Sequence, residues 1–90
     1  MEKAETIIAN VGARAAELRR AQGWTQEDLA GRLKIEPQSV QRIERGMNLS
    51  IRSLVKLAHA LGVPTIALFQ AAKSGERRPG RPKKDPSAQR

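Results

Sequence analysis

Residues 26–45 read QEDLAGRLKIEPQSVQRIER, and the fold follows from this stretch. Its apolar residues recur at the spacing of two short helices, with about three residues between them. Helices joined by so tight a turn must pack closely, which requires apolar residues at fixed positions and a small residue at the crossing. We expect Ala30 at the crossing and five larger residues pointing inward: Leu29, Leu33, Ile35, Val40 and Ile43.

The ends of both helices are marked by residues with capping chemistry. Thr25 offers an N-cap hydroxyl, and acidic residues follow in the first turn, so the first helix is expected over about 25–33. Pro37 suits the first position of the second helix, where its missing N–H costs nothing. Gly46 is a C-terminal stop, so this helix is expected over about 37–45.

Three more helices are expected around this pair. Residues 6–21 place apolar side chains on one helical face before Gly23, and Ser50 can cap a helix that ends at Gly62. The inward residues of these two helices are Ile8, Val11, Ala15, Leu18, Leu54, Leu57, Ala58 and Leu61. A last short helix holds Ile66, Leu68 and Phe69. The sequence thus predicts five helices in one domain, residues 1–72.

The composition fits such a domain and excludes other classes. Ninety residues with 39% apolar content can fill one small core, and the near absence of aromatic residues favours helices over a sheet. There is no cysteine and His59 is the only histidine, so we expect neither disulfides nor a metal site. No apolar run has the length of a signal peptide or membrane span, and we expect a soluble protein in a reducing compartment.

Positive charge is concentrated at the C-terminal end of the chain. The net charge of +8 would attract a polyanion, with nucleic acid as the first candidate. Residues 1–72 carry ten basic against seven acidic side chains, whereas residues 73–90 carry seven against two. The stretch 73–86 has three prolines, two glycines and no apolar side chain. We therefore expect residues 73–90 to form a disordered basic tail.

Three motifs occur in order: GWTQEDLA at 23–30, SVQRIERG at 39–46 and LAHALGV at 57–63. Together they resemble the Cro and lambda-repressor family, also called the XRE family, over about residues 10–70. The resemblance implies an all-α, five-helix lambda-repressor-like DNA-binding domain with a helix-turn-helix. It implies a cytoplasmic, nucleoid-associated regulator of transcription, acting as a repressor. The third helix is expected in the major groove of double-stranded DNA, with the second across the backbone.

The resemblance also assigns roles to the polar residues of the third helix. Gln38, Gln41 and Arg42 lie opposite its apolar face and match positions at which the family reads bases. Glutamine can bond adenine N6 and N7 together, and arginine can do the same with guanine O6 and N7. Ser39 is expected to reach a base or a phosphate.

Other residues match family positions that contact phosphate. Gln26 stands at the N-terminus of the second helix, where exposed N–H groups and the dipole favour an anion. Arg45, Asn48 and Arg52 surround the loop after the third helix and are expected to contact the backbone. These four residues would position the protein without reading the sequence.

One basic and one acidic residue, Arg19 and Glu44, are expected to be structural. The family pairs the positions of Arg19 and Glu44 in a partly buried salt bridge, which accounts for an acidic residue on a helix that faces DNA. Trp24 resembles a core-lining or hinge-filling residue, and His59 is expected on solvated helix surface. Exposed glutamine and arginine are usually plain surface, so the base-reading roles depend on the motif.

The chain departs from the family pattern in the turn. Lys34 stands where glycine is usual, and a left-handed backbone there would cost about 1 kcal/mol. Glu36 replaces the usual serine or threonine cap, and Pro37 can offer DNA only an apolar contact. The operator sequence therefore cannot be copied from a relative.

The tail offers a second DNA reader. Residues 78–84, RPGRPKK, resemble an AT-hook, although Pro79 stands where the hook has its first core arginine. Glycine would let the backbone sink into a narrow A·T minor groove where arginine inserts. The hook residues would be Arg78, Gly80, Arg81, Lys83 and Lys84. The alternative is a generic arm that attracts phosphates.

Other functions are weighed against DNA binding. No nucleophile and base, carboxylate pair or metal cluster has recognisable spacing, so we expect no enzyme, no cofactor, no small-molecule ligand and no membrane association. An antitoxin of a toxin–antitoxin pair and a restriction-modification controller share this fold and size and stay open. A homodimer through the residues after Gly62 is expected, because one short helix cannot bury all its large apolar residues.

Overall fold

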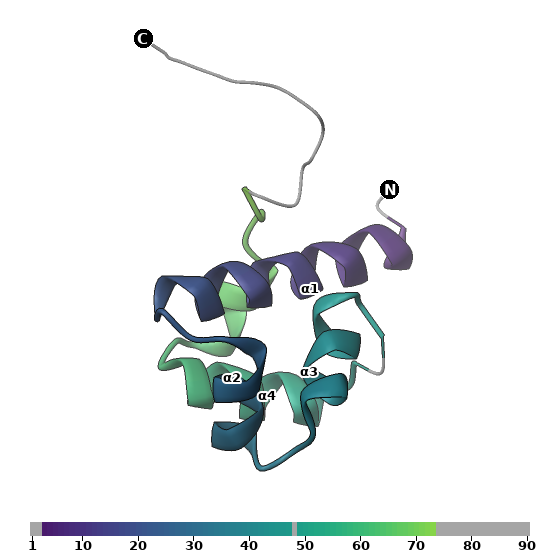
Figure 1. The fold of residues 1–90 in the computed structure, drawn as a ribbon. Coiled ribbons are helices and arrows are strands. Elements are labelled where there is room, and N and C mark those ends of the chain that lie inside the picture. Colours follow the sequence, from purple (N-terminus) through teal and green to yellow (C-terminus); the bar gives the residue numbers. More distant parts are fainter. Residues whose placement is uncertain (1–2, 48, 74–90) are drawn as a thin grey trace, which may run out of the picture.

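The computed structural model describes residues 3–47 and 49–73 and is all-α over these residues (Figure 1). It contains four α-helices and one short 3₁₀ helix. Their bounds are α1 (Ala4–Ala21), α2 (Gln26–Leu33), α3 (Pro37–Glu44), α4 (Ile51–Leu61) and η1 (Thr65–Phe69). None of the described helices is both long and apolar enough to cross a membrane.

Local capping chemistry sets the ends of α2 and α4. The Thr25 hydroxyl accepts from the Asp28 N–H at 3.0 Å, and the Asp28 carboxylate accepts from the Thr25 N–H at 2.8 Å. Ser50 and Ser53 form the same reciprocal pair at the start of α4. Gly62 ends α4 in the left-handed region with φ of 74°. These ends agree with the prediction because capping depends on residues close in sequence.

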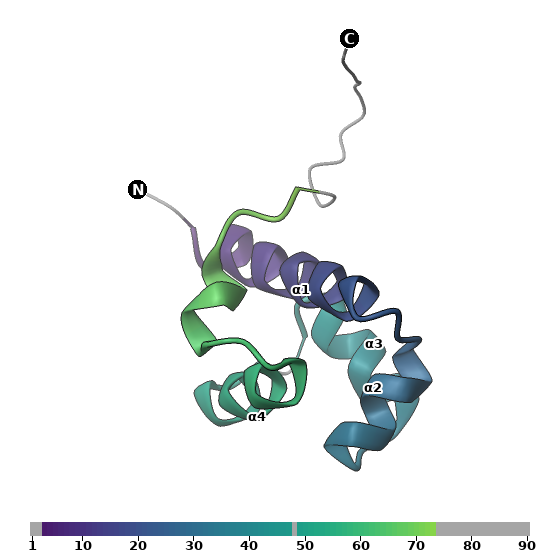
Figure 2. The same ribbon diagram turned by 90° about the vertical axis from the view of Figure 1, so that its left-hand side faces the viewer.

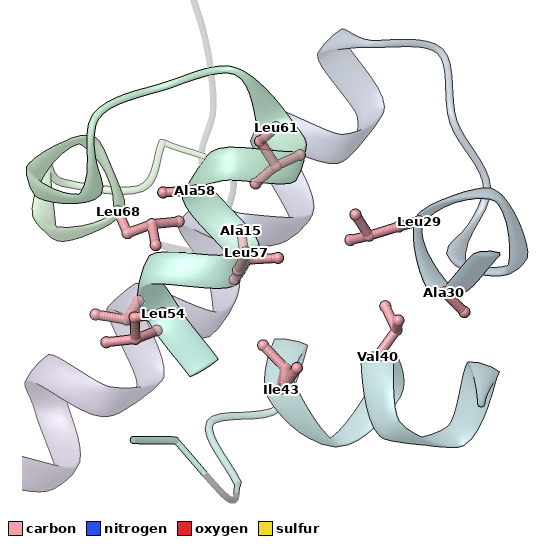
Figure 3. Close-up of a cluster of buried hydrophobic side chains, with 11 residues drawn as sticks. Ala15, Leu29, Ala30, Val40, Ile43, Leu54, Leu57, Ala58, Leu61 and Leu68 are labelled. Atoms are coloured by element: carbon pink, nitrogen blue, oxygen red, sulfur yellow. The ribbon is translucent and has the colours of Figure 1, made fainter. Parts of the chain in front are cut away.

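The core lies where α1 and η1 meet the helix-turn-helix pair and α4. Figure 2 shows α1 running across the bundle, with α2 and α3 on one side and α4 and η1 on the other. The buried side chains converge on this space from every element (Figure 3). The largest fully buried ones are Val11, Leu29, Val40, Leu57, Leu61 and Leu68. Ala30 is also buried, in agreement with its expected place at the helix crossing.

Gly12 lets α1 approach the end of α3. A Cβ atom built on Gly12 would lie 2.5 Å from the carbonyl oxygen of Glu44 and 2.8 Å from that of Ile43. No side chain fits there, so the two backbones touch. This contact sets the distance between α1 and the helix-turn-helix, and no pattern in the sequence predicts it.

Two polar side chains of α1 bind the end of the described chain. Asn10 donates to the Gln70 carbonyl at 2.9 Å and accepts from the Ala72 N–H at 2.8 Å. Arg14 donates to the Ala67 carbonyl at 3.0 Å and to the Gln70 side chain at 3.0 Å. These bonds hold η1 and the residues after it against α1.

Several predicted details were wrong. Helix α1 begins at Ala4 rather than residue 6, and α3 ends at Glu44 rather than residue 45. The predicted last short helix is present as a 3₁₀ helix, since only five residues lie between Pro64 and Gln70 and the Ala67 N–H bonds three residues back. The five-helix count holds only if this turn is included.

Two residues predicted to point inward are partly exposed. Ile8 is 37% exposed because it lies near the free end of α1, where it covers Gly46 rather than the core. Ile35 is 38% exposed because it sits in the turn between α2 and α3, outside helical periodicity.

Candidate nucleic-acid interface

Helix α3 presents a polar face on the side opposite its buried residues. Val40 is fully buried and Ile43 is 9% exposed, and both point into the core. The exposed residues are Gln38, Gln41, Arg42 and Arg45, which follow the i, i+3, i+4, i+7 spacing of one helical face. Ser39 is half-buried beside them. The structure therefore brings three of the four predicted base-reading side chains onto one open surface, with Ser39 at its margin.

The turn before α3 is left-handed at its lysine. Lys34 has φ of 59° and ψ of 44°, the left-handed conformation that glycine adopts without strain. The N–H groups of Lys34 and Ile35 bond the carbonyls of Gly31 and Ala30 at 3.3 and 3.0 Å, which closes the end of α2. Pro37 then starts α3 and is exposed. Lys34 thus adopts the left-handed conformation considered for this position from the sequence.

A buried ion pair fixes α3 from behind. The Arg19 guanidinium donates to both carboxylate oxygens of Glu44, at 2.7 and 3.2 Å. Its remaining nitrogen donates to the Trp24 carbonyl at 2.8 Å. Both charged side chains are at most 10% exposed. The pair implied by the family resemblance is present, and it joins α1 to α3 and to the connection before α2.

The same carboxylate also holds Gln26. The Gln26 amide nitrogen donates to Glu44 Oε1 at 2.9 Å. A primary amide has two N–H donors, so one remains for another acceptor. Gln26 is the first residue of α2, where a helix N-terminus favours an anion. No spacing rule connects residues 26 and 44, so this contact cannot be predicted from the sequence.

The structure describes only some of the other residues that are predicted to contact the DNA backbone. Arg45 and Arg52 are exposed, at the end of α3 and in the first turn of α4. Asn48 lies outside the described residues, as do all five predicted minor-groove residues: Arg78, Gly80, Arg81, Lys83 and Lys84.

Trp24 and His59 occupy structural or solvated positions. Trp24 packs against the core, and the Arg32 guanidinium lies 4.0 Å from its ring centre. A cation at this distance is attracted to the ring face, so Trp24 has a partner on that face already. His59 is exposed on α4.

Comparison with known proteins identifies the family. The helix-turn-helix family model matches residues 16–68. An uncharacterized transcriptional regulator in the ATPase CF(0) region of Rhodospirillum rubrum is 38% identical over 80% of this chain and 68% of its own length. The uncharacterized HTH-type transcriptional regulator y4dJ of Sinorhizobium fredii is 41% identical over 64% of this chain and 77% of its own length.

Solved structures agree with this family. The hypothetical transcription factor NHTF from Neisseria superposes with a TM-score of 0.70 at 26% identity, covering 82% of this chain and 87% of its own. The restriction-modification controller protein C.AhdI from Aeromonas hydrophila has a TM-score of 0.65 at 38% identity, covering 69% and 96%. The chain therefore belongs to the XRE-type helix-turn-helix family of DNA-binding transcriptional regulators.

Proposed function

We propose that this chain is a repressor that reads an operator through the major groove with α3. The observation that supports this most is the exposed set Gln38, Gln41 and Arg42 on a helix whose other side is locked to α1. Side chains on a rigid helix can meet base edges at fixed positions, and bidentate contacts from glutamine and arginine discriminate bases.

Residues around α3 would set the register on the backbone. Gln26, Arg45, Asn48 and Arg52 would contact phosphates, which fix orientation without reading sequence. Because Glu44 accepts one Gln26 amide proton, the second N–H is the one available to a phosphate oxygen. The carboxylate that anchors α3 would thereby also orient the contact made by α2.

The experiment that tests this proposal is selection of bound sequences from random duplex DNA. The full chain is expected to enrich one motif, and the Arg42→Ala variant is expected to lose preference at one position of it. Enrichment of no motif would exclude base reading by α3, and enrichment of the same motif by both proteins would exclude base reading by Arg42.

A homodimer would supply the second half of the operator. One recognition helix covers few base pairs, and two inverted half-sites about one helical turn apart give adequate specificity. After Gly62, Leu68 is fully buried, while Ile66 is 72% and Phe69 is 45% exposed. Exposed apolar residues on so short a helix suit an interface between two copies.

Dimerisation can be measured with matched isoleucine variants. Ile66→Ser is expected to weaken dimerisation in sedimentation experiments and to reduce the DNase footprint to one half-site. Ile51 is equally exposed, at 72%, but lies on α4, so Ile51→Ser is the control and should dimerise like wild type. Dimerisation of the Ile66→Ser variant at wild-type strength would place the interface elsewhere.

The tail is proposed to bind the minor groove beside the operator. Deletion of residues 73–90 removes five net positive charges and should reduce the slope of log affinity against log salt by up to about four units. If the tail is a hook, Arg81→Ala should weaken binding to A·T-flanked operators more than to G·C-flanked ones. If it is a generic arm, Arg81→Ala and Lys84→Ala should cause equal losses on both flanks.

Two other functions within this fold remain to be tested. The 38% identity to a restriction-modification controller favours that role as the second candidate, and the genes beside this one would decide it. An antitoxin would co-purify from its native host with a stoichiometric small protein. The free-standing regulator would not.

A further inference from the structure

A cleft between α2 and α4 is lined by none of the proposed DNA-contact residues. Its α2 side is formed by the end of the helix and the turn, with Gly31, Arg32, Leu33 and Lys34. Its α4 side is formed by the middle and the C-terminal part of that helix, with Val55, Lys56, His59 and Ala60. Three features of these residues distinguish the cleft from ordinary surface.

The first feature is a glycine that the fold does not need. Gly31 lies inside α2 and is exposed, and a Cβ atom built on it would meet nothing within 4 Å. Glycine inside a helix is less stable than alanine, because it loses more backbone freedom on folding. Gly12 shows the contrast, since a Cβ there would strike backbone atoms of α3. At Gly31 no packing reason offsets the loss.

The second feature is a lysine at position 34, where glycine would be locally more stable. Its backbone is left-handed, so glycine would remove strain there, yet a lysine is present. Stability alone favours alanine at position 31 and glycine at position 34. Gly31 and Lys34 line the same cleft, and each is locally less stable than the alternative residue. Residues that oppose local stability without structural compensation are typical of functional sites.

The third feature is the chemistry of the lining. Arg32, Lys34 and Lys56 are cations on the rim, and no carboxylate lines the cleft within the described part of the chain. Neither lysine forms an ion pair with any residue in 3–47 or 49–73. Leu33, Val55 and Ala60 supply an apolar floor, and Val55 is 49% exposed. An apolar centre inside a charged rim is the pattern of a protein interface.

We propose that this cleft docks an acidic segment of a partner protein, with carboxylates on the lysines and aliphatic side chains over Val55. The absent side chain at Gly31 lets the segment approach the backbone of α2. A DNA backbone fits less well, because phosphates and sugars would leave the apolar floor without a partner. This proposal goes beyond the DNA-reading function and does not depend on it.

The test uses NMR amide shifts of the full chain with a synthetic probe, a short peptide of repeating Glu-Glu-Leu. We expect shifts confined to the second half of α2, the turn and α4, with binding that weakens as salt rises. Replacing every Glu of the peptide by Gln should abolish binding, and replacing Leu by Ser should weaken it. These two peptides separate the charged rim from the apolar floor.

Two variants distinguish docking from fold stability. Gly31→Ala and Lys34→Gly should each raise the melting temperature, because they remove the local penalties, yet each should weaken peptide binding by about threefold or more. Arg20→Gln removes an exposed charge on α1 outside the cleft and should change neither quantity. Affinity for operator DNA should be the same in all of these variants.

Absence of cleft shifts, or equal binding by the Gly31→Ala variant and wild type, would overturn the proposal. Shifts of the same amides by duplex DNA, with weaker DNA binding by the Lys34→Gly variant, would assign the cleft to nucleic acid instead. Neither result would alter the sequence-selection test of α3.

Discussion

The two faces of α3, a helix of eight residues, serve opposite purposes. The inner face carries Val40, Ile43 and Glu44, and each is held by packing or by hydrogen bonds to α1. The outer face carries Gln38, Gln41 and Arg42, which are exposed. The inner face thus supplies rigidity, and the outer face supplies chemistry. Changes on the inner face should alter stability without altering base preference, and changes on the outer face should do the reverse.

Glu44→Ala is the strongest test of the inner face. It leaves the buried Arg19 charge without its carboxylate and should destabilise the fold by about 3–5 kcal/mol. Thermal melting without DNA measures this. Glu44→Gln keeps an oxygen acceptor for Arg19 and should lose less stability than Glu44→Ala. A melting temperature equal to wild type would show that the pair adds no stability, and Arg19→Ala is a poorer test because it also removes packing by the side-chain stem.

Gly12→Ala should have the next largest effect, about 1–3 kcal/mol of destabilisation from overpacking against α3. The matched control is Gly31→Ala, also a glycine-to-alanine change in a helix, which should stabilise by about 1 kcal/mol because it meets no atom. Urea unfolding of both variants measures the sign of each change in the free energy of unfolding. A Gly12→Ala variant as stable as wild type would contradict the close approach of α1 and α3, and destabilisation by Gly31→Ala would contradict the open space at position 31.

Arg42→Ala tests the outer face. Loss of a bidentate guanine contact should weaken the best site by about 1–3 kcal/mol and relax the preference at one base pair, with melting unchanged. Gln38→Ala should act similarly at a neighbouring position, whereas Arg52→Ala should weaken all sequences equally. Competition binding with single-base operator variants measures this. An unchanged base preference would mean either that α3 is not the recognition helix or that Arg42 is only a phosphate contact.

The smallest effect is expected at Asp28, which belongs to neither face. The backbone and side chain of Thr25 hydrogen-bond to this carboxylate and lower its pKa below the ordinary value of 3.8. A lowered pKa in the folded state means that the carboxylate stabilises the fold above pH 3.8, and that this contribution fades as the pH falls through the lowered pKa. Asp28→Ala should therefore melt slightly below wild type at neutral pH. The difference should vanish in acid, and a difference independent of pH would exclude the charge as its origin.

Local chemistry made most of the secondary structure predictable from sequence. Thr25, Ser50 and Gly62 end their helices as expected, because a cap uses only residues within one turn. The polar face of α3 also follows from its period, since Val40 and Ile43 point inward and leave Gln38 and Arg42 outside. For the Arg19–Glu44 pair the spacing alone was uninformative, and only the family resemblance suggested it.

Only the tertiary structure decided the contacts between residues far apart in the chain. The Gln26 amide meets Glu44, Gly12 touches the last carbonyls of α3, and Asn10 binds the residues after η1 because the bundle places them together. Residues at the edges of periodic segments, such as Ile35, were misplaced because exposure depends on which neighbours cover them. A sequence encodes its helices over a few residues at a time, whereas crossing distances, buried networks and clefts exist only after the helices pack.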